Sequence, residues 1–348
     1  MRIKKYVLLF AALLFSFSSK KFKGLKVPNS RIWLGNFRKR ALNSVGSSVF
    51  PMFKEFIKTD IFIVRKINFE TNKNIIAICV IKNDLEKLKK FLEHHRKLGI
   101  KQFAFLDDHS SDGTKEFLLA QDDVELFESS DSFFTERKEA WINRILAYYG
   151  FNRWYAVLDS DELLVYDNCE EYKIDEFVAL MEKENITAVS GIMIDMYFHD
   201  GIKYFDKTGY FDGEYTRFMP NKTGGMRYRI FGMQMYLGKT PLFLLDNKTI
   251  YHIHCLFPFE KNFQKKDFLA LLHYKFLDGD LEKYKERVKN KSMYKGSEEY
   301  KRYVEKIDNG NLNFYDENVS EKFVNSKTLV ENKLIAELCN KRGKNYDY

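Results

Sequence analysis

The sequence predicts an α/β protein of the Rossmann type, with a mainly parallel sheet and helices on both of its faces. Between about residues 70 and 194, short runs rich in Ile, Val and Phe alternate with amphipathic segments. This alternation is typical of repeated β-α-β units. Polar clusters directly follow three of the apolar runs, at 82–84, 107–108 and 159–161. Because ligands bind outside the carboxyl ends of parallel strands, the clusters predict one site at one edge of the sheet.

Each element of the alternation has its own local signal. The predicted strands are continuous apolar runs, as expected where both faces of a sheet are covered. The predicted helices carry apolar residues at a spacing of three to four, and Gly99 and Gly150 end two of them. The strands are predicted at 74–81, 101–106, 124–129, 154–158 and 187–194, and the helices at 85–98, 115–120, 135–149 and 175–185.

The remaining parts of the chain give weaker patterns. Residues 24–70 show no clear period, and the glycine-rich, aromatic stretch 195–262 favours hairpins. Residues 263–348 look helical, and His273 is expected to pack within a helix. We therefore expect three parts, which are an N-terminal apolar and basic segment with a helical lead-in, a catalytic domain and a helical C-terminal extension, at 1–70, 71–262 and 263–348.

Composition sets limits on the function. The 348 residues are 45% hydrophobic, which allows a large core, and the formal charge is +8. This charge suits a phosphate-rich ligand, an anionic membrane surface or simply a solvated Lys-rich surface. No basic stripe with interleaved aromatic residues is present, so a nucleic-acid partner is not expected. The four cysteines are far apart and form no C-x-x-C pair, which predicts free thiols in a reducing, cytoplasmic setting.

The N-terminus contains an apolar run, Tyr6–Phe17, between clusters of lysines. The run is too short to cross a hydrocarbon core of ~30 Å as a helix. It fits the apolar region of a signal peptide with a small-residue site at Ser16–Ser18, an interfacial segment with its lysines at the lipid headgroups, or a buried helix. Our expectation is peripheral contact of residues 1–23 with the inner face of the membrane.

Asp159 and Asp161, in the stretch WYAVLDSDELLVY, are the strongest candidates for chemistry. If the strand extends through them, they lie on one face, because side chains alternate along a strand. Two adjacent carboxylates repel each other unless a cation lies between them, and Mg²⁺ or Mn²⁺ prefers such oxygen ligands. The ion would neutralise charge on a departing diphosphate. A solvated turn or a helix cap is the alternative.

Other polar residues allow two interpretations each. Asp107 could accept a hydrogen bond from a nucleobase imide or only cap its turn. His252 and His254 would share one face of a strand, where they could bind a metal or phosphate or be structural. Arg227 and Arg229 suit a diphosphate or an anionic acceptor, or else belong to a surface hairpin.

Two stretches together resemble family-2-type glycosyltransferases, and more narrowly the bacterial branch related to glycosyltransferase family 92. They are residues 80–114, from VIKND to SSDGT, and residues 154–166, WYAVLDSDELLVY. The similarity covers about residues 75–166. It departs from the family pattern at Asp84, where Glu is usual, and at His109 within the loop. Looser landmarks are IDMY, GGMRYRIFG, KTPL, HIH and LLHYKF, at 194–197, 224–232, 239–242, 252–254 and 271–276.

This resemblance implies a GT-A fold and a nucleotide-sugar donor, for which we expect a UDP-sugar. Asp84 and Asp107 would lie near the nucleoside, and Asp159 and Asp161, with His254 as a third candidate ligand, would hold the diphosphate through Mn²⁺ or Mg²⁺. The residues expected to bind the donor are Lys82, Asn83, Asp84, Asp107, Asp108, Arg227 and Arg229.

Enzymes of this type generally invert the anomeric centre, which requires a base for the acceptor hydroxyl. Asp195 is our first candidate, because it follows the strand 187–194 and its DMY sequence resembles a family landmark. Asp200, Asp212 and Glu214 are rivals. Alternatively, Asp195 only caps a turn or forms a salt bridge with an arginine.

Three functions therefore remain open at the level of sequence. The first is an inverting, metal-dependent glycosyltransferase that acts on a surface glycan or its lipid-linked precursor. The second is a metal-dependent phosphoester hydrolase or nucleotidyltransferase that uses the same carboxylates. The third is a nucleotide-binding or membrane-surface module without turnover. The ordered landmarks favour the first.

Overall fold

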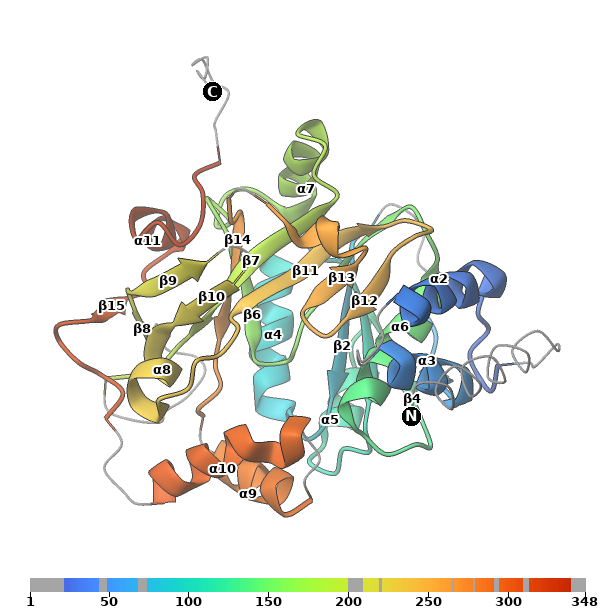
Figure 1. Cartoon of the computed structure of the whole chain (residues 1–348), viewed down its shortest axis with the longest axis horizontal. Coiled ribbons are helices and arrows are strands. Elements are labelled where there is room, and N and C mark those ends of the chain that lie inside the picture. Colours follow the sequence, from blue (N-terminus) through green and yellow to red (C-terminus); the bar gives the residue numbers. More distant parts are fainter. Residues whose placement is uncertain are drawn as a thin grey trace.

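The computed structural model describes most of the chain and is organised around one central sheet (Figure 1). In the described residues this sheet has nine strands, in the order β1-β4-β3-β2-β5-β11-β7-β14-β6. The described ranges are 22–43, 49–67, 74–199, 209–218, 221–264, 266–277, 279–290, 294–308 and 313–338. The strands are β1 Phe62–Arg65, β2 Ile76–Ile81, β3 Gln102–Asp107, β4 Val124–Glu128, β5 Arg153–Val157, β6 Glu162–Tyr166, β7 Ala188–Asp195, β11 Gly238–Leu245 and β14 Leu269–His273.

Six of the nine strands of this sheet run in one direction, namely β2, β3, β4, β5, β7 and β14. β2 pairs in parallel with β3 and β5, β3 with β4, and β7 with β14. β11 is antiparallel to both β5 and β7, so β5 and β7 run in the same direction. β1 and β6 are antiparallel edge strands. The predicted α/β class with a mainly parallel sheet is therefore confirmed.

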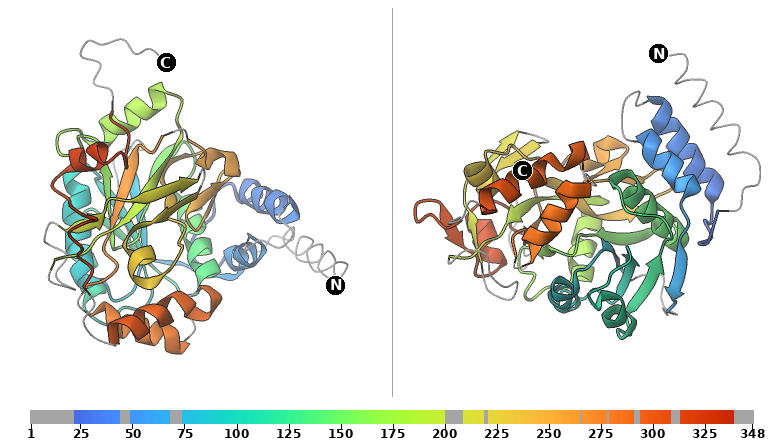
Figure 2. Two further views of the ribbon diagram at one scale, coloured as in Figure 1. Left: turned by 60° about the vertical axis from the view of Figure 1, so that its left-hand side comes forward. Right: turned by 90° about the horizontal axis from the view of Figure 1, so that it is seen from below.

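Helices cover both faces of the sheet (Figure 1 and Figure 2). Along β2, Ala77 and Cys79 belong to the core that includes α4, and Ile76 and Ile78 to the core that includes α6. This alternation is why the run is apolar throughout. The helices are α2 Ser30–Asn43, α3 Val49–Lys58, α4 Leu85–Lys97, α5 Thr114–Leu119, α6 Thr135–Tyr149, α7 Ile174–Lys183, α8 Gly225–Phe231, α9 Asp280–Asn290, α10 Tyr294–Asp308 and α11 Ser326–Glu331.

Short two-stranded sheets surround this framework. They pair β8 with β15, β9 with β10, and β12 with β13. Their bounds, with that of the 3₁₀ turn η1, are β8 Tyr210–Asp212, β9 Tyr215–Phe218, β10 Asn221–Gly224, β12 Ile250–His252, β13 Cys255–Phe257, η1 Phe259–Asn262 and β15 Ser320–Lys322. In the parts of the chain that the structure describes, no helix has both the length and the apolar character that a membrane crossing requires.

Two local predictions are wrong. The segment around His273 is a strand and not a helix, because β14 pairs with β7 on one side and β6 on the other. The sheet therefore extends past residue 262, where we expected the catalytic domain to end. The predicted strand 154–158 is present as β5, but it ends before Asp159 and Asp161, which we expected to share one face of a strand. WYAVLDSDELLVY forms β5, a turn at 158–161 and β6, and β6 returns along the far edge of the sheet.

Gly191 allows β7 and β14 to approach closely. A Cβ at this position would lie 2.3 Å from the backbone oxygen of Leu269. We therefore expect Gly191→Ala to lower the free energy of unfolding by about 1–3 kcal/mol or more, the cost of overpacking a core. Denaturant unfolding measures the change. The matched control is Gly35→Ala on the exposed side of α2, where a Cβ meets nothing within 4 Å and alanine should stabilise the helix by up to ~1 kcal/mol. Equal stability of the two variants would contradict the prediction.

Candidate active site

A cavity of about 600 Å³ opens at the carboxyl ends of the parallel strands. The end of β2, the turn 159–161 and the end of β14 form its base. Residues 132–134 and the first turns of α6 form one wall of the cavity. The helix α9 and Tyr300 of α10 form another wall. Figure 1 shows α9 and α10 lying together across this end of the sheet. The predicted convergence of strand ends on one site is therefore present in the structure.

The segment 82–84 is held firmly at the cavity. Asn83 adopts a left-handed backbone conformation with φ of 53°, and its side-chain oxygen accepts from the backbone N–H of Ser111 at 2.7 Å. Asp84 precedes α4, and its carboxylate accepts a hydrogen bond from the Ser160 hydroxyl at 2.7 Å. Lys82, Asn83 and Asp84 all line the cavity. The contact with Ser160 explains how the residue between the two acids contributes to the site.

Asp107 caps its turn, which was the alternative to a base contact, and Asp108 is the one of the two that faces the cavity. The Asp107 carboxylate accepts from the backbone N–H and hydroxyl of Ser110 and does not line the cavity. Asp108 lines the cavity and is 2% exposed. Neither of its carboxylate oxygens has a hydrogen-bond partner among the described residues, although the Lys82 ammonium lies 3.4 Å away. Burial raises the pKa of Asp108, and Lys82 partly offsets this effect. Asp108 is thus a buried acid with free capacity to accept hydrogen bonds from a ligand.

Asp159 is already paired with lysines. The Lys138 ammonium of α6 lies 2.6 Å from its carboxylate, and the Lys239 ammonium of β11 lies 3.7 Å away. Burial raises the pKa of Asp159, but these two cations outweigh burial and hold it well below its usual range. Lys239 also contacts Glu162 at 2.6 Å, with both side chains 1% exposed. The landmark KTPL therefore supplies a buried cation to the acidic turn, a role that the sequence did not reveal.

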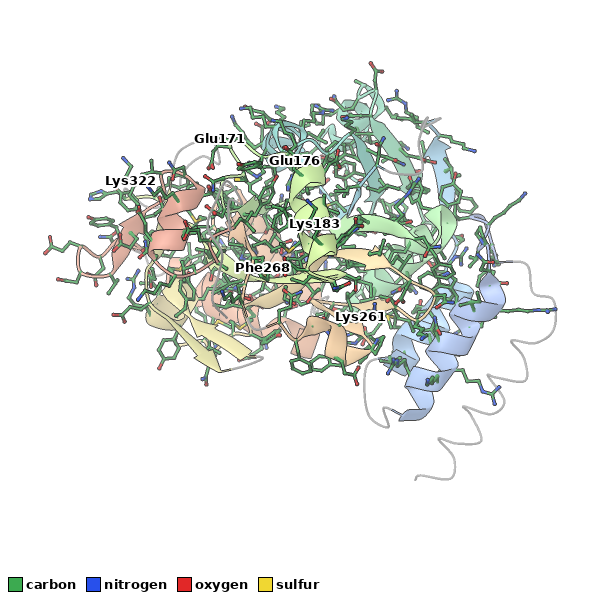
Figure 3. All side chains as sticks on the ribbon, turned by 90° about the horizontal axis from the view of Figure 1, so that it is seen from above. Glu171, Glu176, Lys183, Lys261, Phe268 and Lys322 are labelled. Carbon is green, nitrogen blue, oxygen red and sulfur yellow. The ribbon has the colours of Figure 1, made fainter. Side chains whose placement is uncertain are left out.

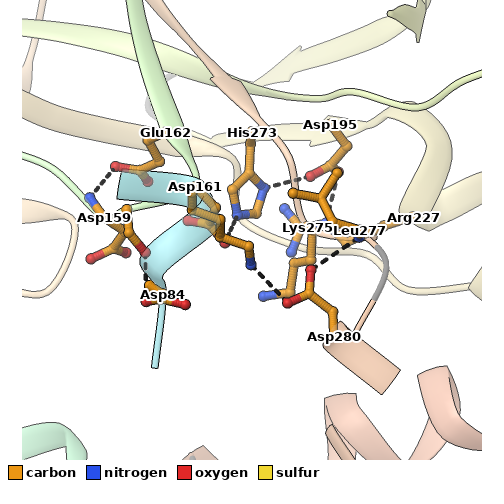
Figure 4. A network of polar contacts seen from close by, with 12 residues as sticks. Asp84, Asp159, Asp161, Glu162, Asp195, Arg227, His273, Lys275, Leu277 and Asp280 are labelled. Atoms are coloured by element: carbon orange, nitrogen blue, oxygen red, sulfur yellow. Dashed lines mark hydrogen bonds and ion pairs between the residues drawn. The ribbon is translucent and has the colours of Figure 1, made fainter. Parts of the chain in front are cut away.

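Asp161 faces a histidine that the sequence placed in a helix. His273 ends β14, and its Nε2 lies 3.6 Å from the Asp161 carboxylate (Figure 4). Its Nδ1 lies 2.7 Å from Asp195, whose carboxylate is the acceptor when Nδ1 carries the proton. The backbone N–H of Tyr274 donates to the Asp161 carbonyl oxygen at 2.8 Å, which joins β14 to the acidic turn. His273 lines the cavity, so it is a site residue that sequence reasoning missed.

Asp195 lies behind His273 and does not line the cavity. It is 1% exposed, and its second oxygen accepts from Arg227 Nε at 2.7 Å. Burial raises the pKa of Asp195, but Arg227 and His273 outweigh burial and hold it well below its usual range. A carboxylate so engaged is a weak proton acceptor, which argues against our expectation that it is the base. The salt-bridge alternative agrees with the observed contacts.

Arg227, Arg229 and His254 also lie elsewhere than expected. The two arginines belong to the helix α8 and not to a hairpin; Arg227 binds Asp195, and Arg229 binds Asp212 at 2.8 Å. His254 lies in the turn after β12, where burial and Lys239 lower its pKa to about 3. None of the three lines the cavity. The position of each of these side chains depends on a partner that is distant in sequence, namely Asp195, Asp212 or Lys239.

The helix α9 brings two further basic residues to the cavity. The Lys283 ammonium lies 2.9 Å from the Asp84 carboxylate. Arg287, one turn later, donates to the Tyr300 hydroxyl at 2.9 Å and also lines the cavity. Their i, i+4 spacing places both on one face of the helix. This spacing was the signal that the sequence offered, but it does not by itself indicate which face covers a site.

Opposite charges are balanced around the cavity. Its lining contains six basic and six acidic side chains, namely Lys82, Lys87, Lys138, Lys275, Lys283, Arg287, Asp84, Asp108, Asp159, Asp161, Asp280 and Glu286. Such a lining can exchange its internal ion pairs for contacts with an anionic ligand, because each lysine that leaves an acid is free to bind phosphate.

Whether a metal ion fits this site depends on which side chains can act as its ligands. Among the described residues, no group of three or more His, Cys, Asp or Glu side chains is already placed to hold one. Asp161 and His273 nevertheless present a carboxylate oxygen and an imidazole nitrogen to each other, with Asp195 behind the imidazole. A carboxylate behind a histidine is the usual support of a metal-binding imidazole. The donor chemistry therefore suits a divalent ion, provided that Asp159 gives up Lys138.

Comparison with known proteins adds little to this geometry. No protein-family model and no curated protein matches the chain. Among solved structures, a mannosyltransferase from Pyrobaculum calidifontis, PcManGT in complex with GDP-Man and Mn²⁺, is similar at 12% identity and a TM-score of 0.28. The match covers 46% of this chain and 47% of that chain, so this chain spans about half of that structure.

Proposed function

We propose that this protein is a glycosyltransferase that uses a nucleotide-sugar donor. The observation that carries the proposal is the cavity at the carboxyl ends of the parallel strands, lined by Asp84, Asp108 and Asp161 together with a set of lysines. The ordered motifs at these positions, which resemble family-2-type glycosyltransferases, support the same function. The cavity is large enough for a small organic ligand, since such sites usually have volumes of ~300–1,000 Å³.

Asp108 would bind the nucleoside part of the donor, and the basic side chains would bind its diphosphate. The buried carboxylate of Asp108 has two acceptor oxygens without hydrogen-bond partners among the described residues. It would accept from a nucleobase N–H or a ribose hydroxyl. Lys283 and Arg287 line the cavity from α9. They would bind the diphosphate, since guanidinium and ammonium groups match phosphate oxygens.

We further propose that Asp161 and His273 hold Mn²⁺ or Mg²⁺, with Asp159 joining them when Lys138 turns to the diphosphate. Bound there, the ion would neutralise the negative charge that develops on the departing diphosphate. Asp195 would keep the Nδ1 proton of His273 in place and so leave Nε2 free to act as a ligand. In this assignment Asp195 positions a ligand and does not remove the acceptor proton.

The remaining parts of the proposal come from the sequence. We propose inversion at the anomeric carbon, a UDP-sugar as donor and a surface glycan or its lipid-linked precursor as acceptor. We also propose a cytoplasmic protein that contacts the inner face of the membrane through residues 1–23. A phosphoester hydrolase or nucleotidyltransferase would use the same carboxylates. Release of free phosphate without an acceptor would favour that alternative, and sugar transfer would favour ours.

A screen of nucleotide sugars by thermal unfolding tests donor binding. A ligand that binds only the native state at a hundredfold excess over its Kd stabilises the protein by about 2.7 kcal/mol, which for a chain of this size is a rise in Tm of a few degrees. We expect one nucleotide sugar with Mn²⁺ to give this rise and Asp108→Asn to reduce it. Asp175→Asn on the exposed side of α7 is the matched control. A chain that responds to no nucleotide sugar under these conditions would refute the proposed donor.

A further inference from the structure

Positive charge is concentrated at the start of the chain. Residues 1–54 contain 12 basic and no acidic side chains, and the first acid is Glu55. The remaining 294 residues, with 45 basic and 49 acidic side chains, carry a formal charge of −4. The net charge of +8 is therefore a local feature of the N-terminal part. Such segregation indicates a partner with an anionic surface.

The helix α2 presents part of this charge on a folded, outward face. Trp33 and Phe37 are fully buried in the core that α2 shares with α3 and α6. Arg31, Arg38 and Lys39 are exposed. Arg38 and Lys39 follow Arg31 by seven and eight residues, or about two helical turns, so the three lie on one face of α2. Ile32, beside them, is 38% exposed. The inner face is thus fixed by packing, while the outer face is basic with an apolar neighbour.

Exposed apolar side chains also lie on the hairpin next to the helix (Figure 1). Phe259 and Phe263 are 39% and 48% exposed, and their rings lie 5.3 Å apart. Ile253 in the turn after β12 is 36% exposed. In the described residues these side chains lie on the hairpin β12–β13 and the turn that follows it, and Figure 1 shows this hairpin beside α2.

Specific contacts join the two parts. The Arg40 guanidinium lies 5.9 Å from the Phe257 ring, and the Asn36 amide donates to the Asn247 carbonyl oxygen at 2.8 Å. The Phe257 ring is in turn 6.5 Å from Phe259. Together the residues form what we call the basic–aromatic surface, which consists of Arg31, Ile32, Arg38, Lys39, Ile253, Phe259 and Phe263.

We propose that the basic–aromatic surface docks on a bilayer that contains anionic lipids. The arginines and lysine would meet the headgroups, while the phenylalanines and isoleucines would enter the boundary between headgroups and acyl chains. A soluble polyphosphate or sulfated glycan would match the cations but would leave the phenylalanines and isoleucines in contact with water. This surface goes beyond the proposed contact through residues 1–23 and does not depend on the proposed activity. It would supply a second contact, which stable membrane binding generally requires.

Co-sedimentation of the full chain with vesicles tests the proposal. The probes are vesicles of phosphatidylcholine alone and of phosphatidylcholine with phosphatidylglycerol. We expect binding only to the second kind, and binding that weakens with salt. The double variant Arg38→Glu/Lys39→Glu should bind about tenfold more weakly or worse, since each basic residue near an anionic surface contributes severalfold to affinity. Phe259→Ala/Phe263→Ala should also weaken binding.

A matched control separates this surface from a general effect of charge. Lys183 of α7 and Lys322 of β15 lie away from α2 (Figure 3), and both are exposed. Lys183→Glu/Lys322→Glu changes the net charge by the same amount and should leave binding within about twofold of the wild type. Unchanged binding of Arg38→Glu/Lys39→Glu, or equal losses in the two charge variants, would overturn the proposal.

Insertion can be observed directly with a new tryptophan. The three native tryptophans, Trp33, Trp141 and Trp154, are 0%, 0% and 6% exposed. Phe263→Trp therefore provides an exposed reporter, whose fluorescence we expect brominated anionic vesicles to quench. No quenching above that of the wild type would overturn the docking geometry. If Phe259→Ala/Phe263→Ala instead dissociates a dimer in sedimentation and leaves vesicle binding intact, the surface joins two copies of the chain and the proposal is wrong.

Discussion

Asp161→Asn is expected to reduce the rate of sugar transfer by about 10²–10⁴-fold, because a group that stabilises charge in the transition state contributes several kcal/mol. Asp161 lines the cavity, and its carboxylate faces His273. Burial raises the pKa of Asp161, but His273 and Lys87 outweigh burial, so the carboxylate is ionised at neutral pH. The amide has nearly the same shape but lacks the charge. Initial rates at saturating donor and Mn²⁺ measure the effect.

Two comparisons make this experiment specific. Asp159→Asn should lose activity as well, but it also removes the carboxylate that Lys138 contacts at 2.6 Å, so its Tm needs separate measurement. Asp175→Asn, on the exposed side of α7, should leave the rate unchanged. Near-normal transfer by a folded Asp161→Asn variant, or full turnover of the wild type in excess chelator, would remove the carboxylate–metal arrangement from the mechanism.

Local patterns predict five of the nine strands of the sheet, namely β2, β3, β4, β5 and β7. The run 74–81 is buried on both faces, and 85–98 forms an amphipathic helix that packs against it, so periodicity is sufficient for β2 and α4. The prediction fails at β14, because LALLH has only five residues and is followed by a Tyr-Lys-Phe run that also fits a helix. What makes it a strand is the pair of neighbours β7 and β6, and the sequence does not encode those pairings locally.

The residues of the cavity also fall into a group that the sequence predicts and a group that it does not. Lys82, Asn83, Asp84, Asp108, Asp159 and Asp161 line the cavity because each directly follows a strand, and strand ends converge. His273, Lys283 and Arg287 reach the same cavity from the last quarter of the chain. Their positions depend on where β14 enters the sheet and how α9 folds across its end. Residue type alone also could not reveal that Arg227 forms a salt bridge with Asp195, with 2.7 Å between Arg227 Nε and the Asp195 carboxylate.

Asp195→Asn distinguishes two roles for one buried carboxylate. In our proposal Asp195 orients His273, its partner at 2.7 Å. The amide can also donate to Nδ1 and favour the tautomer whose Nε2 carries the proton and cannot bind a metal. We therefore expect the affinity for Mn²⁺ to fall about 10–100-fold, the usual cost of losing such support. Saturating Mn²⁺ should then restore most of kcat. Calorimetric titration of the full chain with Mn²⁺, alongside initial rates, measures both quantities.

If Asp195 were instead the base, the same variant would bind Mn²⁺ normally and lose about 10²–10⁴-fold in kcat even at saturating metal and donor. Because Asp195 also pairs with the buried Arg227, the variant must first be shown to be folded. His273→Gln supplies a second test, since it leaves the Asp195–Arg227 pair in place and removes the imidazole that would bind the ion. We expect it to weaken Mn²⁺ binding at least as much as Asp195→Asn. Normal Mn²⁺ affinity in both variants would exclude His273 as a ligand and Asp195 as its support.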